Sequence, residues 1–290
     1  MANVSADKIG VIDLCANFWT PEWIAMKPPW GRTFFPSKLR VDPAIINGVE
    51  AEELVERMDA AGVERVLMIA GKCGRLGLPG AYHTPYDMVA RFVEKFPDRF
   101  SALAGIDPFE GMTGVRVMED AIKNMGFVGA HVYPHWFELA PDHAKYYPFY
   151  AKCCELEVPI QIHVGQSMVY ERSNPCRSVA RPITLDAVAC DFQELTIIGI
   201  HIGVPWTEEM LAMSWKHDRV YIGTDAHSPR YWPKPLIHYL NTFGQDKVLF
   251  GTDFPVLDFG KAIEQVNELE IRPEAYAKLM RDNAKRIYKL

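Results

Sequence analysis

Short apolar runs alternate with amphipathic segments along the chain, and this alternation constrains the fold more than any other feature of the sequence. The runs that we predict as strands are residues 10–14, 63–70, 100–106, 127–132, 158–163, 195–201, 220–223 and 247–250. The segments that we predict as helices are residues 50–61, 84–96, 113–124, 141–156, 182–190, 207–214, 231–243, 259–269 and 273–288. Strands separated by helices indicate a parallel sheet, and eight such repeats favour closure into a (β/α)8 TIM barrel.

The length of 290 residues suits one such barrel, so residues 1–290 are predicted to form a single domain that ends in a terminal helix, 273–290. Residues 17–48, after the first strand, form the longest irregular stretch. A loop of this length is expected to belong to a site or a lid. A cover over the barrel bottom and a dimer contact are the alternatives. Thr84 is expected to be the N-cap of the helix that follows it, with Pro85 just inside.

Composition narrows the class of protein. The hydrophobic content of 49% allows a sizeable core, and the net charge of −6 argues against a nucleic-acid-binding face. No apolar run approaches the ~18 residues that span a membrane, and the N-terminus does not resemble a signal peptide. The six cysteines lack CxxC spacing, which favours reduced thiols in a cytoplasmic enzyme. We also expect a homo-oligomer.

Three metal-competent side chains follow predicted strands. His163 and His201 each precede a glycine by two positions, and Asp253 lies in the run Phe250-Gly251-Thr252-Asp253-Phe254-Pro255. Carboxyl ends of barrel strands meet at one mouth, so these side chains are expected to converge there. Histidine binds metals and shuttles protons, and aspartate binds metals or acts as a general base. The alternatives are packed histidines and a helix N-cap at Asp253.

Four further residues are candidates on the same reasoning. Asp225 and His227 follow the seventh predicted strand, where Asp225 could orient a histidine or bind substrate and His227 could donate a proton. Both could equally cap the next helix. His131 and Trp136 follow the fourth predicted strand and are candidate substrate-binding residues, unless they only pack against each other.

Aromatic and cationic residues crowd the predicted mouth-side loops. Aromatic walls suit a planar substrate, and arginine binds carboxylates. Loop packing and ordinary surface charge are the alternative explanation. Arg177 and Arg230 are our candidate ligands for a substrate carboxylate. The full set is Trp19, Trp23, Trp30, Phe34, Phe35, Trp136, Trp206 and Trp232, with Lys72, Arg75, Arg177, Arg181 and Arg230.

Together these motifs resemble the amidohydrolase superfamily, in particular its aminocarboxymuconate-semialdehyde-decarboxylase-like subgroup of decarboxylases and hydrolases. Those that carry the resemblance include His163-Val164-Gly165, His201-Ile202-Gly203, Gly251-Thr252-Asp253-Phe254-Pro255 and Asn283-Ala284-Lys285-Arg286-Ile287-Tyr288. The resemblance implies one divalent metal at the barrel mouth, most often zinc. His163 and Asp253 would be ligands together with an HxH pair on the first strand, and His201 would be a catalytic or polarising group.

The chain departs from this pattern on the first strand. It reads Ile12-Asp13-Leu14-Cys15-Ala16-Asn17, so Cys15 and Asn17 stand where the two histidines are expected. Four possibilities follow. Cys15, His163, Asp253 and His201 could hold the metal; Glu22 of the long loop could supply a ligand; the metal, zinc or manganese, could bind weakly; or the site could use His163, His201, Asp225 and Asp253 without metal.

The sequence therefore predicts an enzyme that acts on a small aromatic or acyl carboxylic substrate. The leading hypothesis is metal-assisted hydrolysis next to a carbonyl, at a C–C, ester or amide-like bond. Asp253 would take the proton of the metal-bound water, and His201 would stabilise the oxyanion. The alternative is non-oxidative decarboxylation of an aromatic acid. An alternative of another class is a metal-free pseudoenzyme that only binds a ligand.

Overall fold

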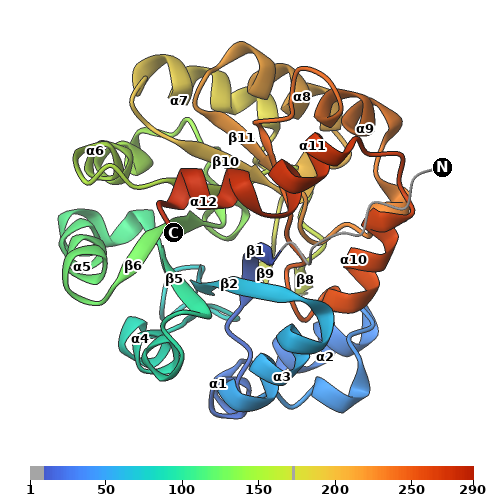
Figure 1. The fold of residues 1–290 in the computed structure, drawn as a ribbon. Coiled ribbons are helices and arrows are strands. Elements are labelled where there is room, and N and C mark those ends of the chain that lie inside the picture. Colours follow the sequence, from blue (N-terminus) through green and yellow to red (C-terminus); the bar gives the residue numbers. More distant parts are fainter. Residues whose placement is uncertain (1–9, 172–173) are drawn as a thin grey trace.

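The computed structural model describes residues 10–171 and 174–290, and its centre is one parallel sheet rolled into a nearly closed barrel (Figure 1). The order of the strands in this sheet equals their order in the sequence, as the predicted βα repeats require. The strands are β1 (Val11–Asn17), β2 (Val63–Ala70), β5 (Phe100–Gly105), β6 (Phe127–Val132), β7 (Ile160–His163), β10 (Ile197–Ile200), β11 (Val220–Gly223) and β12 (Val248–Leu249). The predicted (β/α)8 architecture is confirmed.

Helices surround the barrel in the predicted alternation (Figure 1). They present apolar faces to the strands, and their buried side chains join those of the outer strand faces in one core layer. The barrel-flanking helices are α3 (Ala51–Ala61), α4 (Tyr86–Lys95), α5 (Gly111–Asn124), α6 (Tyr147–Glu155), α7 (Leu185–Asp191), α8 (Thr207–Lys216), α9 (Lys234–Leu240) and α10 (Phe259–Asn267). None of the described helices is long and apolar enough to cross a bilayer.

The predicted terminal helix is present over residues 273–288, with a π-helical turn in its middle. Its three parts are α11 (Pro273–Ala277), the π-helical turn (Lys278–Asp282) and α12 (Asn283–Tyr288). This segment, red in Figure 1, crosses one end of the barrel. There the Gln161 side chain of β7 donates from Nε2 to the Tyr288 hydroxyl at 2.8 Å and to the Leu14 carbonyl at 2.6 Å. The C-terminus thus closes the end opposite the strand carboxyl termini.

The stretch predicted to be irregular, 17–48, contains α1 (Pro21–Met26), α2 (Pro29–Ser37) and a 3-10 turn (Pro43–Ile45). Sequence periodicity missed them because each is short and begins at a proline. Thr20 caps α1 by accepting a hydrogen bond from the Trp23 amide at 3.2 Å. Trp19 Nε1 donates to the Ile45 carbonyl at 2.7 Å, which ties the two ends of the stretch together.

The expected start of α4 is wrong by two residues. The helix begins at Tyr86 with Pro85 as its N-cap residue, and Thr84 lies outside it. No side-chain hydrogen bond from the described residues caps α4, so Thr84 does not act as its N-cap. Its amide instead donates to the Gly71 carbonyl at 2.9 Å.

Two small hairpins that the sequence did not predict extend from the ends of the strands. β3 (Lys72–Cys73) pairs with β4 (Tyr82–His83), and β8 (Tyr170–Glu171) pairs with β9 (Asn174–Pro175), both antiparallel. Two-residue strands are too short for an alternating pattern to show in the sequence. The first hairpin follows β2 and brings Cys73 and Tyr82 to the mouth of the barrel.

The seam between β1 and β12 is closed by a carboxylate as well as by backbone hydrogen bonds. The Leu14 amide donates to the Phe250 carbonyl at 3.0 Å, and the Asp253 amide donates to the Cys15 carbonyl at 2.9 Å. Asp13, fully buried, accepts at Oδ1 from the amides of Cys15 (3.1 Å) and Thr252 (3.0 Å), and its Oδ2 accepts from the Thr252 hydroxyl. Asp13 therefore holds the residue next to Asp253.

Replacing Asp13 should destabilise the barrel. In Asp13→Ala, two buried amides and one hydroxyl lose their acceptor, which should lower the free energy of unfolding by about 2–4 kcal/mol. Urea denaturation measures this change. Asp87→Asn, which removes an exposed ion pair to Arg91, is the matched control and should cost no more than about 1 kcal/mol. Equal effects of the two variants would contradict the role given to Asp13.

Candidate active site

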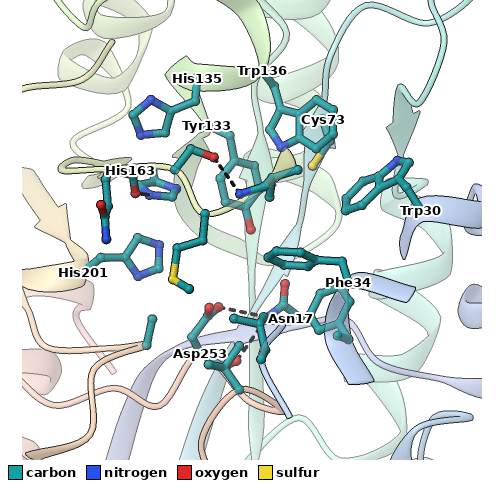
Figure 2. A pocket seen from close by; sticks show the side chains of 18 of the residues that line it. Asn17, Trp30, Phe34, Cys73, Tyr133, His135, Trp136, His163, His201 and Asp253 are labelled. Atoms are coloured by element: carbon teal, nitrogen blue, oxygen red, sulfur yellow. Dashed lines mark hydrogen bonds between the residues drawn. The ribbon is translucent and has the colours of Figure 1, made fainter. Parts of the chain in front are cut away.

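A cavity of about 130 Å³ opens at the carboxyl ends of the strands. Figure 2 shows two unlike walls: Trp30, Phe34 and Trp136 face His163 and His201 across it. Trp30 and Phe34 belong to α2, so the long stretch after β1 forms part of the site, as expected, and does not cover the barrel bottom. The lining residues are Asn17, Trp30, Phe34, Phe35, Leu39, Cys73, Tyr82, Tyr133, His135, Trp136, His163, Gln166, Ser167, Met168, Val169, His201, Ala226, His227, Asp253 and Val256.

Asp253 forms the floor of the cavity, just past β12. Its backbone is left-handed (φ 56°), a conformation that aspartate tolerates and that is common at functional sites. The Asn17 side chain donates from Nδ2 to Asp253 Oδ1 at 2.9 Å, and Cys15 Sγ lies 3.9 Å from the same oxygen. Burial raises the pKa of Asp253 to about 8, although the positive charge of His201 acts in the opposite direction.

His201 and Asp225 form a buried ion pair beside Asp253. Nδ1 of His201 lies 3.0 Å from Oδ2 of Asp225, and the His201 amide donates to Oδ1 at 3.2 Å. Burial alone would lower the pKa of His201, but the charges of Asp225 and Asp253 more than offset it and raise the pKa to about 9. His201 is therefore an imidazolium at neutral pH, and its Nε2 is the ring nitrogen left for the cavity.

The other histidines around the cavity are neutral. The ring of His163 lies 4.1 Å from that of His201 and 4.5 Å from that of His135. Burial, together with the positive charge of His201, lowers the pKa of His163 well below 6.5 and the pKa values of His135 and His227 to about 4. One cation and several neutral imidazoles thus face the aromatic wall.

The structure brings most of the predicted site residues together. His163, His201, His227, Trp136 and Asp253 line the cavity. Two others lie behind this lining: Asp225 pairs with His201, and Cys15 contacts Asp253. His131 is wholly buried with its ring 4.2 Å from that of Tyr133, so it does not reach the cavity.

Three predicted residues lie elsewhere. Glu22 is exposed in the first turn of α1, and its neighbours on the inner side of that helix fill the core instead. The Arg177 side chain is 71% exposed and paired with Glu138. Arg230 is exposed beside α9. These three do not line the cavity in the structure of residues 10–171 and 174–290. The predicted arginine ligands for a carboxylate are not assembled there.

Several lining residues were not assigned a role from the sequence. His135 and Tyr133 belong to the run His131-Val132-Tyr133-Pro134-His135-Trp136, whose density of aromatic rings was the available signal. Asn17 stood at an expected ligand position but was not assigned a function of its own. Cys73 and Tyr82 gave no signal, because a hairpin too short to predict places them at the mouth.

A sequence model of the amidohydrolase family matches residues 12–290, almost the whole chain. This chain belongs to the amidohydrolase family. It is 24% identical over 282 residues to the gamma-resorcylate decarboxylase of a Rhizobium species, a match that covers 80% of this chain and 85% of that protein.

Solved structures show the same fold as this amidohydrolase. An uncharacterised TIM-barrel protein from Bordetella bronchiseptica aligns with a TM-score of 0.77 at 23% identity, over 97% of this chain and 98% of the other. 5-Carboxyvanillate decarboxylase from Novosphingobium aromaticivorans, with manganese and a nitrobenzoic acid bound, aligns with a TM-score of 0.72 at 16% identity, over 97% and 96% of the two chains. The metal in that relative is manganese and not the zinc that we expected.

The donors in this chain do not reproduce the ligand set that the family resemblance implies. Behind and at the floor of the cavity, Cys15, Asp225 and Asp253 offer possible ligand atoms that all lie within 4.8 Å of one another. His163 is outside this group, and the atom of Asn17 that faces Asp253 is a nitrogen donor. The predicted ligand set of His163, His201, Asp253 and Cys15 is therefore not gathered around one point.

The charge on His201 should depend on Asp225. In Asp225→Asn the imidazole loses its buried anionic partner, so we expect its pKa to fall from about 9 toward the ordinary value of about 6.5. NMR titration of isotope-labelled histidine measures the change. Asp186→Asn, which removes the carboxylate 2.7 Å from His217 at the surface, is the control and should leave the His201 titration unchanged. An unchanged His201 titration in Asp225→Asn would refute the ion pair.

Proposed function

We propose that this protein is a non-oxidative decarboxylase that removes CO2 from a single-ring aromatic carboxylic acid. One observation carries the proposal: the half-buried carboxyl group of Asp253 faces an aromatic-walled cavity that raises its pKa to about 8. The relatives support it, since a gamma-resorcylate decarboxylase matches along most of the chain and a 5-carboxyvanillate decarboxylase shares the fold.

The cavity suits a flat ring of limited size. Trp30 and Trp136 lie with ring centroids 5.1 Å apart, and Phe34 packs 6.0 Å from Trp30. Such a wall favours stacking against an aromatic substrate. A volume of the order of 150 Å³ is enough to hold one benzene ring. The imidazolium of His201 lies opposite this wall and attracts the negative charge of the substrate.

The proposed reaction needs one proton at one carbon. The Asp253 carboxyl group transfers its proton to the ring carbon that bears the carboxylate, so a C–H bond forms there. The bond from that carbon to the carboxylate carbon then breaks, its electron pair returns to the ring, and CO2 leaves. Asp253 regains a proton from solvent. A ring hydroxyl next to the carboxylate would make the carbon more basic, and Nε2 of His201 would donate to the substrate oxygens.

The protonation of Asp253 favours this reaction over hydrolysis. Hydrolysis next to a carbonyl, our leading expectation from the sequence, needs Asp253 to accept a proton from water. Burial raises the pKa of Asp253 to about 8, so near pH 7 the group is mainly an acid and not a base. An acid at this position is what protonation of a ring carbon requires.

A panel of hydroxybenzoic acids, assayed for released CO2, tests the proposal. We expect turnover of at least one of them and an alkaline decline in kcat near pH 8, because the acid form of Asp253 is lost as the pH rises through its pKa. Asp253→Asn should lower kcat by about 10²–10⁴-fold. Asp258→Asn changes a nearby carboxylate that only caps α10 and should retain activity.

If the protein released an acid, amine or thiol from carbonyl substrates while none of the aromatic acids yielded CO2, the hydrolase hypothesis would replace this proposal. If neither the CO2 assay nor the hydrolysis assay showed turnover although the aromatic acids bound, a ligand-binding role would be favoured.

The aromatic wall should control affinity more than rate. Trp136→Ala removes one stacking surface, and we expect KM for the aromatic acid to rise by about 5–100-fold with a smaller change in kcat. Steady-state kinetics measure both parameters. Trp215→Ala is the matched control, since this side chain is 69% exposed on α8 and does not line the cavity. A wall that only supports the fold would show unchanged KM in both variants.

A further inference from the structure

The orientation of the Asn17 side-chain amide is fixed by three acceptors. Its Nδ2 lies 2.9 Å from Asp253 Oδ1, 3.1 Å from the Asp253 carbonyl oxygen and 3.2 Å from the Phe254 carbonyl oxygen. If the amide were flipped, its oxygen would face the backbone carbonyl oxygens of Asp253 and Phe254, neither of which can donate a hydrogen bond. The nitrogen therefore points at Asp253, and the assignment follows from the contacts alone.

This orientation places N–H donors where the family resemblance implies a metal-ligating histidine. An amide N–H has no lone pair to offer a cation, whereas the oxygen that could serve is turned away. The same contact engages Oδ1 of Asp253. A metal ion bound to that oxygen would have to displace Asn17 from all three of its acceptors.

The other possible metal ligands at the mouth, Asp225 and Cys15, also contact groups of the protein. Both oxygens of Asp225 contact His201, one through Nδ1 and one through the backbone amide. Cys15 is wholly buried, and its Sγ lies 3.9 Å from Oδ1 of Asp253. The three possible ligands thus already have partners within the protein.

Two basic side chains of the protein lie near these carboxylates. Nδ1 of His201 lies 3.0 Å from Oδ2 of Asp225. Lys27 is 4% exposed and lines a narrow crevice with Asn17, and its Nζ lies 4.3 Å from the ring centroids of both Trp19 and Phe35. The basic groups beside the carboxylates thus belong to the protein itself.

We propose that Asn17 takes the place of the metal in this site: its amide positions the Asp253 carboxyl group at the cavity floor, and the protein works without a divalent ion at the position that the family resemblance implies. Asn17 is a positioning residue, because it acts on the reaction through Asp253. The choice of aromatic acid for an activity assay rests on the proposed function, but the metal measurement does not.

Metal binding of the whole purified protein tests the proposal directly. We would measure manganese and zinc content by elemental mass spectrometry, then titrate the chelator-treated protein with Mn²⁺ by calorimetry. Wild type should hold well below one ion per chain at this site. Asn17→Asp keeps the shape of the side chain but replaces the N–H donors with a carboxylate, so it should bind Mn²⁺ at least about tenfold more tightly than wild type.

Two further variants complete the test. Asp253→Asn in the Asn17→Asp background should abolish the acquired binding, which assigns it to this site. Asn17→Ala removes the hydrogen bonds from the side-chain amide to Asp253 and should lower kcat for the aromatic acid with little change in KM. Added Mn²⁺ should not restore kcat. Circular dichroism would establish that these variants are folded.

One tightly held ion per wild-type chain that is lost in Asp253→Asn would overturn the proposal, as would activity that disappears with chelator and returns with Mn²⁺. Failure of the proposed function is distinguishable from either result. If no aromatic acid yields CO2, the reaction is misassigned, while the metal content of wild type and of Asn17→Asp still decides the role of Asn17.

Discussion

The carboxylate of Asp13 is the contact on which the rest of the site depends. It binds the backbone of Cys15 on the first strand and both the amide and the hydroxyl of Thr252 after the last strand. The seam that closes the barrel therefore also holds Asn17 Nδ2 within 2.9 Å of Asp253 Oδ1. The geometry around Asp253 is determined where the two ends of the sheet meet. There, three hydrogen bonds offset part of the cost of burying Asp13.

The mouth of the barrel holds backbone that most residues avoid. His201, Ala226 and Asp253 all have positive φ, between 56° and 65°. These residues follow β10, β11 and β12, so the unfavourable conformations gather where the reactive side chains must turn inward. Steric contact explains the glycine at position 251, because a Cβ there would lie 2.9 Å from Cβ of Asp225. The buried side chain of Asp225 leaves no room for a larger residue directly before Thr252.

Local contacts also divide the electrostatic roles among similar residues. Asp225 is buried and Asp253 half-buried, yet His201 lowers the pKa of the first, whereas desolvation raises the pKa of the second to about 8. Likewise His201 is charged while His163, 4.1 Å away, is neutral. The ion pair between His201 and Asp225 thus gives these two residues pKa values unlike those of His163 and Asp253.

The sequence by itself determined the barrel, because alternating strands and helices with buried, β-branched runs leave few other ways to cover both faces of a parallel sheet. It also determined that His163, His201 and Asp253 would meet, since strand carboxyl ends converge. Only the tertiary structure decided which neighbours each would have. Glu22 and Arg177 are close in sequence to site residues but lie outside the cavity, whereas Trp30, His135 and Asn17 come from three separate segments. The direction of a side-chain amide, and so the choice between a clamp and a metal ligand at Asn17, depends on acceptors more than 230 residues away, which no local pattern encodes.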